Sequence, residues 1–389
     1  MTRILPIAVL CSAVALAGCS LNDSKGGATP DVSAKANDSS AAQQLGLPLI
    51  ATKNTTRVSG ADPATDAAGV VSAVFPSTNE VNKPRAIALV DKSNWAGAVA
   101  AGVLMSRPLE VPMLVSDGGK LPSVTKDTLG RLKPGGSPLA KNAQVIRVGD
   151  SAANPGGLRT GIIHGKDPYT LAAAVDRFWS VVRGKPSPSV VIASGERADF
   201  AMAAGAWAAR SGDAVLFTQR NTVPAATLKA IRQHSRPSIV ILGPDFIISK
   251  DVEKQLGKLG KVSRIDGPTP VQTAIALART QRGGVGWGIT VPGQNFTIAN
   301  STRPMDAAAA APLAGRGVFA PLLLTDQATS LPNSLESYLL DVQPGFENNP
   351  NAGVYNHVWI LGDKAAVSLP AQGRIDQITE LVPVQVRKP

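Results

Sequence analysis

Five landmarks recur in the same order three times in this 389-residue chain, with a period of roughly 100 residues. Each copy begins with Gly-x-x-Pro directly after an apolar, β-branched run, at Gly60, Gly165 and Gly267. A period of about 20 to 50 residues would indicate a solenoid, whereas one of about 100 lets each copy enclose its own core. The sequence therefore predicts three small domains, at residues 54–158, 159–261 and 262–386.

The later landmarks of each copy alternate strands with Ala-rich helices. A short apolar strand is followed by an amide or acidic residue, at Asn94, Asp199 and Asp306. A second strand ends in a polar residue before a turn with proline, at residues 112–116, 214–218 and 321–325. A last strand ends in glycine, at Gly149, Gly243 and Gly362.

This alternation predicts the α/β class, with Rossmann-like or flavodoxin-like domains. The strands are rich in Val, Ile and Leu and apolar throughout, which suits burial on both faces of a parallel sheet. Such sheets bind ligands beyond the carboxyl ends of their strands. The residues expected along that edge are Gly60, Gly165, Gly267, Ser116, Thr218 and Thr325.

The first 53 residues differ from the rest of the chain. Residues 1–19 combine Arg3, an apolar run and small residues before Cys19, which indicates an export signal. Leu16-Ala17-Gly18-Cys19 resembles the lipobox of bacterial lipoproteins, which implies that Cys19 is acylated and that the protein is anchored in membrane lipid, facing the cell wall or the extracellular side. A plain secretory signal cut nearby is the alternative. Residues 20–53, rich in Ser, Ala, Asp, Asn and Gly, predict a flexible tether.

The net charge of the chain limits the classes of binding partner that we expect. A net charge of +11 on an exported protein suits anionic polymers such as teichoic-acid-like chains or acidic polysaccharides, although it would also serve solubility alone. Nucleic acid is not expected as a partner, because aromatic residues make up only 4% of the chain and its basic residues are scattered.

The sequence contains no clear catalytic or metal-binding pattern. The three histidines, His164, His234 and His357, have no ligand spacing, and the other cysteine, Cys11, leaves with the signal. Gly149-Asp150-Ser151 only weakly matches a hydrolase turn, and the glycines at 284–288 precede a strand rather than open a helix. We therefore expect neither an enzyme nor a metal or cofactor site.

Polar residues beside the repeated turns are the remaining candidates for ligand contact, although a solvated charge is the more frequent role for any one such residue. Asn94, Asp199 and Asp306 are better explained as helix N-caps. The tryptophans are expected in the core. The candidates near Gly-x-x-Pro are Arg57, Asp62, Lys166, Asp167 and Arg264.

These residues resemble a known family, the cell wall-binding repeat of type 2, which is usually found as three tandem copies in Gram-positive surface proteins. The matching marks are Arg57-Val58-Ser59-Gly60, Arg264-Ile265-Asp266-Gly267 and a Pro-Leu-Leu-Leu-Thr run, within a match of about residues 55–385. The resemblance implies one Rossmann-like fold per copy, a pseudo-threefold arrangement and non-covalent binding of an anionic wall polymer. Its apolar strand motif, linked to that binding, falls on Pro321, Leu322, Leu323, Leu324 and Thr325.

The sequence thus predicts a non-enzymatic, membrane-anchored lipoprotein that binds anionic wall polysaccharide through three repeats. The strand motif is less well kept in the first two copies, and His164 stands in copy two where the others have Ser59 or Asp266, so the copies need not bind equally. Two other functions stay open: a solute-binding lipoprotein of an uptake system, and a regulator of a wall hydrolase.

Overall fold

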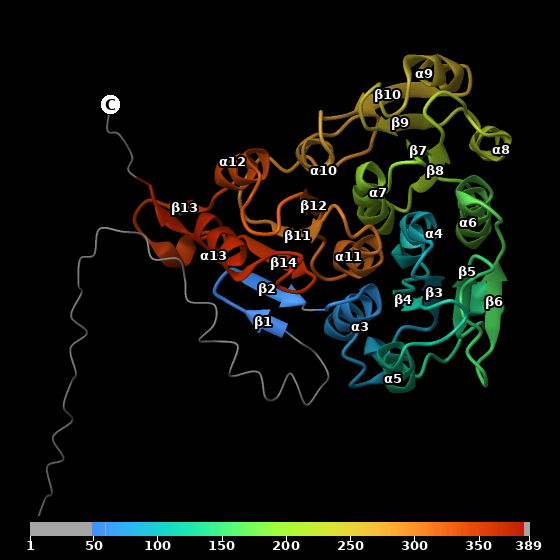
Figure 1. The fold of residues 1–389 in the computed structure, drawn as a ribbon, viewed down its shortest axis with the longest axis horizontal. Coiled ribbons are helices and arrows are strands. Elements are labelled where there is room, and N and C mark those ends of the chain that lie inside the picture. The colour runs from blue at the N-terminus through green and yellow to red at the C-terminus, as the bar shows by residue number, and fades with distance from the viewer. Residues whose placement is uncertain (1–48, 59, 385–389) are drawn as a thin grey trace, which may run out of the picture.

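Three parallel sheets form the framework of the chain, described here for residues 49–58 and 60–384 of a computed structural model (Figure 1). The first two have the strand order second, first, third, fourth, which is the order that begins a flavodoxin-like sheet, and in the third sheet a strand from the start of the described chain takes the fourth place. The predicted α/β class is confirmed. In spatial order, the first sheet contains β4 (Met113–Ser116), β3 (Ile87–Asp91), β5 (Val145–Val148) and β6 (Thr160–Ile163). The second sheet contains β8 (Ala214–Thr218), β7 (Ser189–Ser194), β9 (Ser238–Leu242) and β10 (Lys261–Ile265). The third sheet contains β12 (Leu322–Thr325), β11 (Asn295–Asn300), β14 (His357–Leu361) and β2 (Thr55–Val58).

The fourth strand of every sheet comes from the next copy of the repeat. β6 precedes the second Gly-x-x-Pro but pairs with β5, and β10 precedes the third but pairs with β9. β2 lies at the start of the described chain and joins β14 near its end, with Val58 beside Leu361. The chain therefore closes into a ring. The domain boundaries predicted above follow the repeats in the sequence, and as structural boundaries they stay a prediction.

An additional strand, β1 (Leu49–Ala51), lies antiparallel to β2 at the edge of the third sheet. These residues were expected to end the flexible tether, whereas the structure places them in a strand of the third sheet. Cys19 and most of the predicted tether lie outside the described residues.

The helix that follows each Gly-x-x-Pro begins at its proline, which is favoured at the first helical position. Asp62, Asp167 and Thr269 cap these helices through their side chains. Each helix packs on the second strand of its own copy and on the helix that follows that strand. The pairs are α3 (Pro63–Val74) with α5 (Ser123–Leu132), α6 (Pro168–Arg183) with α8 (Ala225–Gln233), and α10 (Pro270–Arg279) with α12 (Asn333–Asp341).

Three Ala-rich helices occupy the centre, with one sheet outward of each (Figure 1). They are α4 (Trp95–Ala101), continued by a 3-10 turn at Gly102–Met105, α7 (Ala198–Ser211) and α11 (Asp306–Gly315). A Cβ at Gly102 would lie 2.4 Å from the carbonyl oxygen of Gly205, so the first two helices approach too closely for a side chain there. The alanines are explained by this close packing.

The remaining elements cover the outside and the loops. α9 (Lys250–Gly257) and α13 (Leu369–Ile378) follow the third strands of the second and third sheets, and β13 (Gly345–Phe346) pairs with β15 (Val382–Pro383). Trp287, in the insertion of the third copy, packs edge-on against Trp207 with ring centroids 5.8 Å apart. Trp179 is fully buried, as expected for a core residue. None of the described helices combines the length and apolarity needed to cross a membrane.

Candidate functional site

A pair of packed helices recurs in each copy, and the two helices carry equivalent positions. One is the helix that begins at Gly-x-x-Pro, and at the same distance from that proline stand Ser72, Arg177 and Arg279. The other is the helix that follows a second proline, and its equivalent positions are Arg131, Gln233 and Asp341.

Two of the three helix pairs are bridged by their own side chains. In the first copy, Arg131 Nη2 donates to Ser72 Oγ at 2.6 Å. In the third copy, Arg279 forms an ion pair with Asp341. The second copy differs because Arg177 stands opposite the neutral amide of Gln233, and no hydrogen bond or ion pair within the described chain bridges them.

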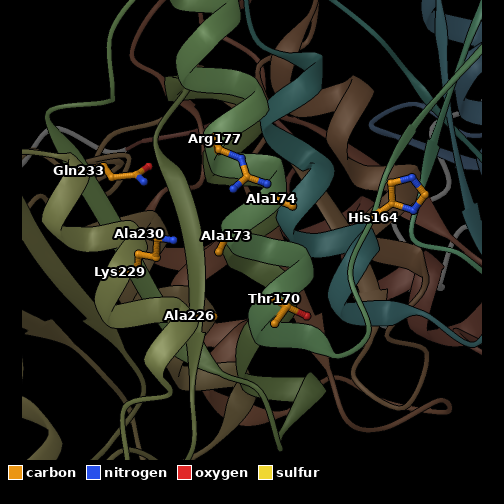
Figure 2. A pocket seen from close by; sticks show the side chains of 9 residues that line it. All are labelled: His164, Thr170, Ala173, Ala174, Arg177, Ala226, Lys229, Ala230 and Gln233. Atoms are coloured by element: carbon orange, nitrogen blue, oxygen red, sulfur yellow. The ribbon is translucent and has the colours of Figure 1, made fainter.

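The open groove between α6 and α8 holds a hollow of about 260 Å³ (Figure 2). Arg177 from α6 and Lys229 and Gln233 from α8 lie along it, and both cations are exposed. Neither cation forms an ion pair with any residue of the described part of the chain, and no carboxylate lines the hollow. The other lining residues are Ala173, Ala174, Ala226, Ala230, Thr170 and His164. Two free cations beside amide and hydroxyl donors make this groove suited to an anionic ligand.

A buried pair of titratable side chains lies just beneath the groove. His234 is buried where α8 ends, with Nε2 2.9 Å from Asp176 Oδ2 and Nδ1 2.9 Å from the carbonyl oxygen of Ser187. Burial by itself would lower the pKa of His234, but the hydrogen bond and charge of Asp176 outweigh it and raise the pKa above its usual range. This buried pair ties α8 to α6 and so fixes the width of the groove.

A second hollow, of about 530 Å³, lies beyond the carboxyl ends of β3, β5 and β6. This is the point where the strand order reverses, at which open α/β sheets commonly bind ligands. Asn94, Asp150, Lys166 and Asp167 line it, so both signs of charge are present. His164 Nδ1 lies 2.6 Å from Asp150 Oδ1, and His164 also lines the groove between α6 and α8.

The matching place in the third sheet is filled by the chain itself. Arg303 forms ion pairs with Asp66 and Asp306, and a Cβ at Gly362 would lie 3.2 Å from the Arg303 guanidinium carbon. The three copies thus differ in what their strand ends can accept.

Arg57 and Arg264, which were candidates for ligand contact, fix the loop after the third strand of their sheets. Arg57 is fully buried and donates to the carbonyl oxygens of Gly362 and Asp363, both at 2.9 Å. Arg264 donates to the carbonyl oxygen of Gly243 at 2.6 Å and pairs with Glu253. These hydrogen bonds explain both arginines structurally, and a role in polymer contact stays a prediction.

The first sheet obtains the same loop contact from the neighbouring strand. Ile162 stands in β6 where the other two sheets have arginine, and its register partner in β5 is Arg147. Arg147 Nη2 donates to the carbonyl oxygen of Ala152 at 2.6 Å, in the loop after β5. The arginine missing from copy two is therefore replaced across the strand pair.

The other predicted contact residues divide into exposed and buried positions. Asp62 and Asp167 are exposed but serve as N-caps, whereas Lys166 is exposed at the second hollow. The buried side chains offer no surface to a polymer, and their role in binding stays a prediction. They are Ser116, Thr218, Pro321, Leu322, Leu323, Leu324 and Thr325.

The hydroxyl groups at the strand ends are explained by their own turns. Thr218 Oγ1 donates to the carbonyl oxygen of Thr222 at 2.9 Å, and Thr325 Oγ1 to that of Gln327 at 2.8 Å. Among the predicted caps, Asn94 is confirmed, because its side chain accepts from the Gly97 amide. Asp199 and Asp306 are not caps, since each lies in the first turn and pairs with an arginine.

Sequence reasoning missed Arg177, Lys229 and Gln233, because no single copy marks them as unusual. Comparing the three copies position by position would have found them, since only copy two lacks a partner across the groove.

Similarity to known proteins agrees with this fold. The model of the cell wall binding domain 2 family matches residues 162–253 and 264–370, which is more than half of the chain. The chain belongs to this family. Two solved Clostridium difficile structures share the fold: Cwp6 (TM-score 0.67, 17% identity, 83% of this chain and 47% of that chain) and Cwp8 (TM-score 0.65, 20% identity, 84% and 52%).

A curated relative is the amidase enhancer of Bacillus subtilis, 21% identical over 247 residues, or 63% of this chain and 32% of that protein. The chain thus spans about a third of this relative and about half of each structural neighbour. A family of wall-binding domains supports association with the cell wall.

Proposed function

We propose that this protein binds an anionic polysaccharide of the bacterial cell wall without catalysing a reaction, and that the groove between α6 and α8 is its main contact. The observation that carries the proposal is that Arg177 and Lys229 are exposed and unpaired among the described residues, in a member of a wall-binding family. Exposed cations beside Gln233 and Thr170 can donate to carboxylate or phosphate oxygens along a polymer.

The proposal assigns binding mainly to one copy and not to three equivalent sites. The equivalent helix pair of the first copy is bridged by Arg131, and that of the third by the ion pair of Arg279 with Asp341. Binding centred on one copy lacks the gain of multivalency, so we expect a moderate affinity that falls steeply with salt.

Sedimentation of the protein with purified wall glycan, at increasing salt, tests the proposal. Replacing Arg177 and Lys229 together by alanine is expected to weaken binding at least about tenfold, since a hydrogen bond to a charged group contributes roughly 1.5–3 kcal/mol. Arg232→Ala is the matched control, because Arg232 is exposed on α8 but does not line the groove. Equal loss in this control would contradict the assignment.

A second variant tests the groove more specifically, because it leaves both cations in place. Gln233→Asp places a carboxylate opposite Arg177, as Asp341 stands opposite Arg279 in the third copy. We expect it to weaken glycan binding by a similar factor while the fold is unchanged. Undiminished binding of this variant would show that the groove is not the contact.

The membrane anchor is a further part of the proposal. It is supported by Leu16-Ala17-Gly18-Cys19, which resembles a lipobox. Expression in a Gram-positive host, followed by mass spectrometry of the amino-terminal peptide, should find Cys19 diacylated or triacylated and the protein in the membrane fraction. Cys19→Ser should release it into the medium, and an unmodified Cys19 would contradict the anchor.

Regulation of a wall hydrolase is the second candidate function, favoured by the similarity to the amidase enhancer. A regulator would change the rate at which a wall amidase releases material from purified walls. An unchanged rate at saturating protein, in walls to which the protein binds, would leave wall binding as the function.

A further inference from the structure

The first sheet ends at β6, and this edge strand carries backbone N–H and C=O groups that point away from the sheet. The amides of Gly149 and Val145 donate to the carbonyl oxygens of Ile163 and Arg159, so the odd-numbered residues of β6 face β5. Because strand residues alternate, Thr160 and Ile162 direct their N–H and C=O groups outward. β5 is the only strand among the described residues that pairs with β6.

The third sheet shows what such an edge accepts in this fold. β2 is the equivalent of β6, and β1 adds to it antiparallel, with Ile50 opposite Arg57. Arg57 and Ile162 occupy the same position relative to the following Gly-x-x-Pro. An extended apolar segment is therefore accommodated on this edge once within the molecule, and the same backbone pattern recurs at β6.

An apolar hollow of about 410 Å³ adjoins β6, between this strand and the carboxyl half of α6. Phe178, Val181 and Val182 of α6 line it, and the side chain of Val181 is among the most exposed apolar ones, at 76%. An apolar side chain on an added strand could enter this hollow, which would remove Val181 from water.

Two exposed cations, Lys141 and Arg159, stand at the rim of the hollow, and no carboxylate lines it. A second copy of this chain is a poor occupant, because pairing β6 with itself would bring four like charges together on proteins that each carry +11. The charges favour an acidic partner.

We infer that the outer edge of β6 binds an extended segment of a partner protein, in which apolar residues alternate between acidic ends, by antiparallel strand addition. Backbone hydrogen bonds to Thr160 and Ile162 provide affinity, and the apolar hollow and the cationic rim provide specificity. This inference does not depend on the groove between α6 and α8.

A fluorescein-labelled peptide, Glu-Asp-Ile-Thr-Leu-Thr-Val-Asp-Glu, is the probe, titrated into the full chain and followed by fluorescence anisotropy. We expect saturable binding, and at least a tenfold weaker binding of the same peptide with a methylated central amide. Absence of saturable binding, or equal binding of the methylated peptide, would overturn the inference.

Two variants test the location. Val181→Glu replaces an exposed apolar side chain at the hollow by a charge that repels the peptide, and Thr160→Pro removes an outward N–H that the ladder with β5 does not use. Each should weaken binding at least tenfold while circular dichroism and glycan binding are retained. Val81→Glu, at a remote valine that is 83% exposed, is the matched control. Unchanged binding in either edge variant contradicts the inference.

A photo-cross-linking amino acid at position 181 identifies the occupant directly. Mass spectrometry should find the peptide joined to this position. A cross-link to the chain's own amino-terminal residues, or to a second copy, in place of the peptide would overturn the assignment to a partner.

Discussion

At the scale of single residues, buried charges hold the ring together where its two ends meet. Asp66 on α3 and Asp306 on α11 are fully buried, and Arg303 pairs with both. Two carboxylates thus share one guanidinium, with Asp363 3.8 Å from it. Burial and the neighbouring charge of Asp306 raise the pKa of Asp66 to about 8, although Arg303 opposes the shift.

This shift predicts a pH dependence of stability. An unfolded aspartate titrates near 4, so the folded protein binds the Asp66 proton more tightly, and the free energy of unfolding falls as pH rises from about 4 to about 8. Asp66→Asn lacks this titration, so its free energy of unfolding relative to the unmodified protein should rise by about 3–4 kcal/mol from pH 5 to pH 8, in urea unfolding followed by circular dichroism. Asp127→Asn, at an exposed residue, should show no such gain, and a pH-independent effect of Asp66→Asn would contradict the account.

At the scale of elements, the three central helices pack through alanine and glycine. Their faces are buried almost completely, and a larger side chain has no space at the closest approach. The sequence showed that these helices are Ala-rich but not that they meet one another, because the same composition would suit a helix lying on a sheet.

The contact between Gly102 and Gly205 can be tested by one methyl group. Gly102→Ala should lower the free energy of unfolding by about 2–4 kcal/mol, because the new Cβ would meet a carbonyl oxygen that cannot move freely. Gly130→Ala in α5 is the matched control: no atom lies within 4 Å of its Cβ, and alanine should stabilise this helix by about 0.5–1 kcal/mol. Equal effects of the two substitutions in thermal unfolding would refute the close packing.

At the scale of the whole molecule, β2 makes the stability of the third sheet depend on the start of the folded chain. The amides of Val358 and Gly362 donate to the carbonyl oxygens of Asn54 and Val58. The ring is thereby closed by a strand about 300 residues away in sequence from its neighbour, so the three copies are not independent units.

Thr56→Pro tests the ring closure, because Thr56 lies between Asn54 and Val58 on the side of β2 that faces β14. Proline removes a ladder hydrogen bond there, and hydrogen exchange measured by mass spectrometry should show faster exchange in β14 and α13. The amides of β9 should exchange as before. Faster exchange confined to residues before 75, with β14 unaffected, would contradict closure by β2.

The sequence by itself determined the elements and their order, because hydrophobic periodicity, Gly-x-x-Pro turns and Ala-rich runs are local properties of the chain. It also predicted the Asn94 cap and the burial of Trp179 and Trp207, whereas Trp95, Trp287 and Trp359 are only partly buried against the core. It marked Arg57 and Arg264 as candidates for ligand contact, which stays a prediction, but it did not show that their guanidinium groups bind loops that only folding brings near. The exchange of a strand between copies, the central helices and the open groove at Arg177 were decided by tertiary structure, since each depends on which distant surfaces meet.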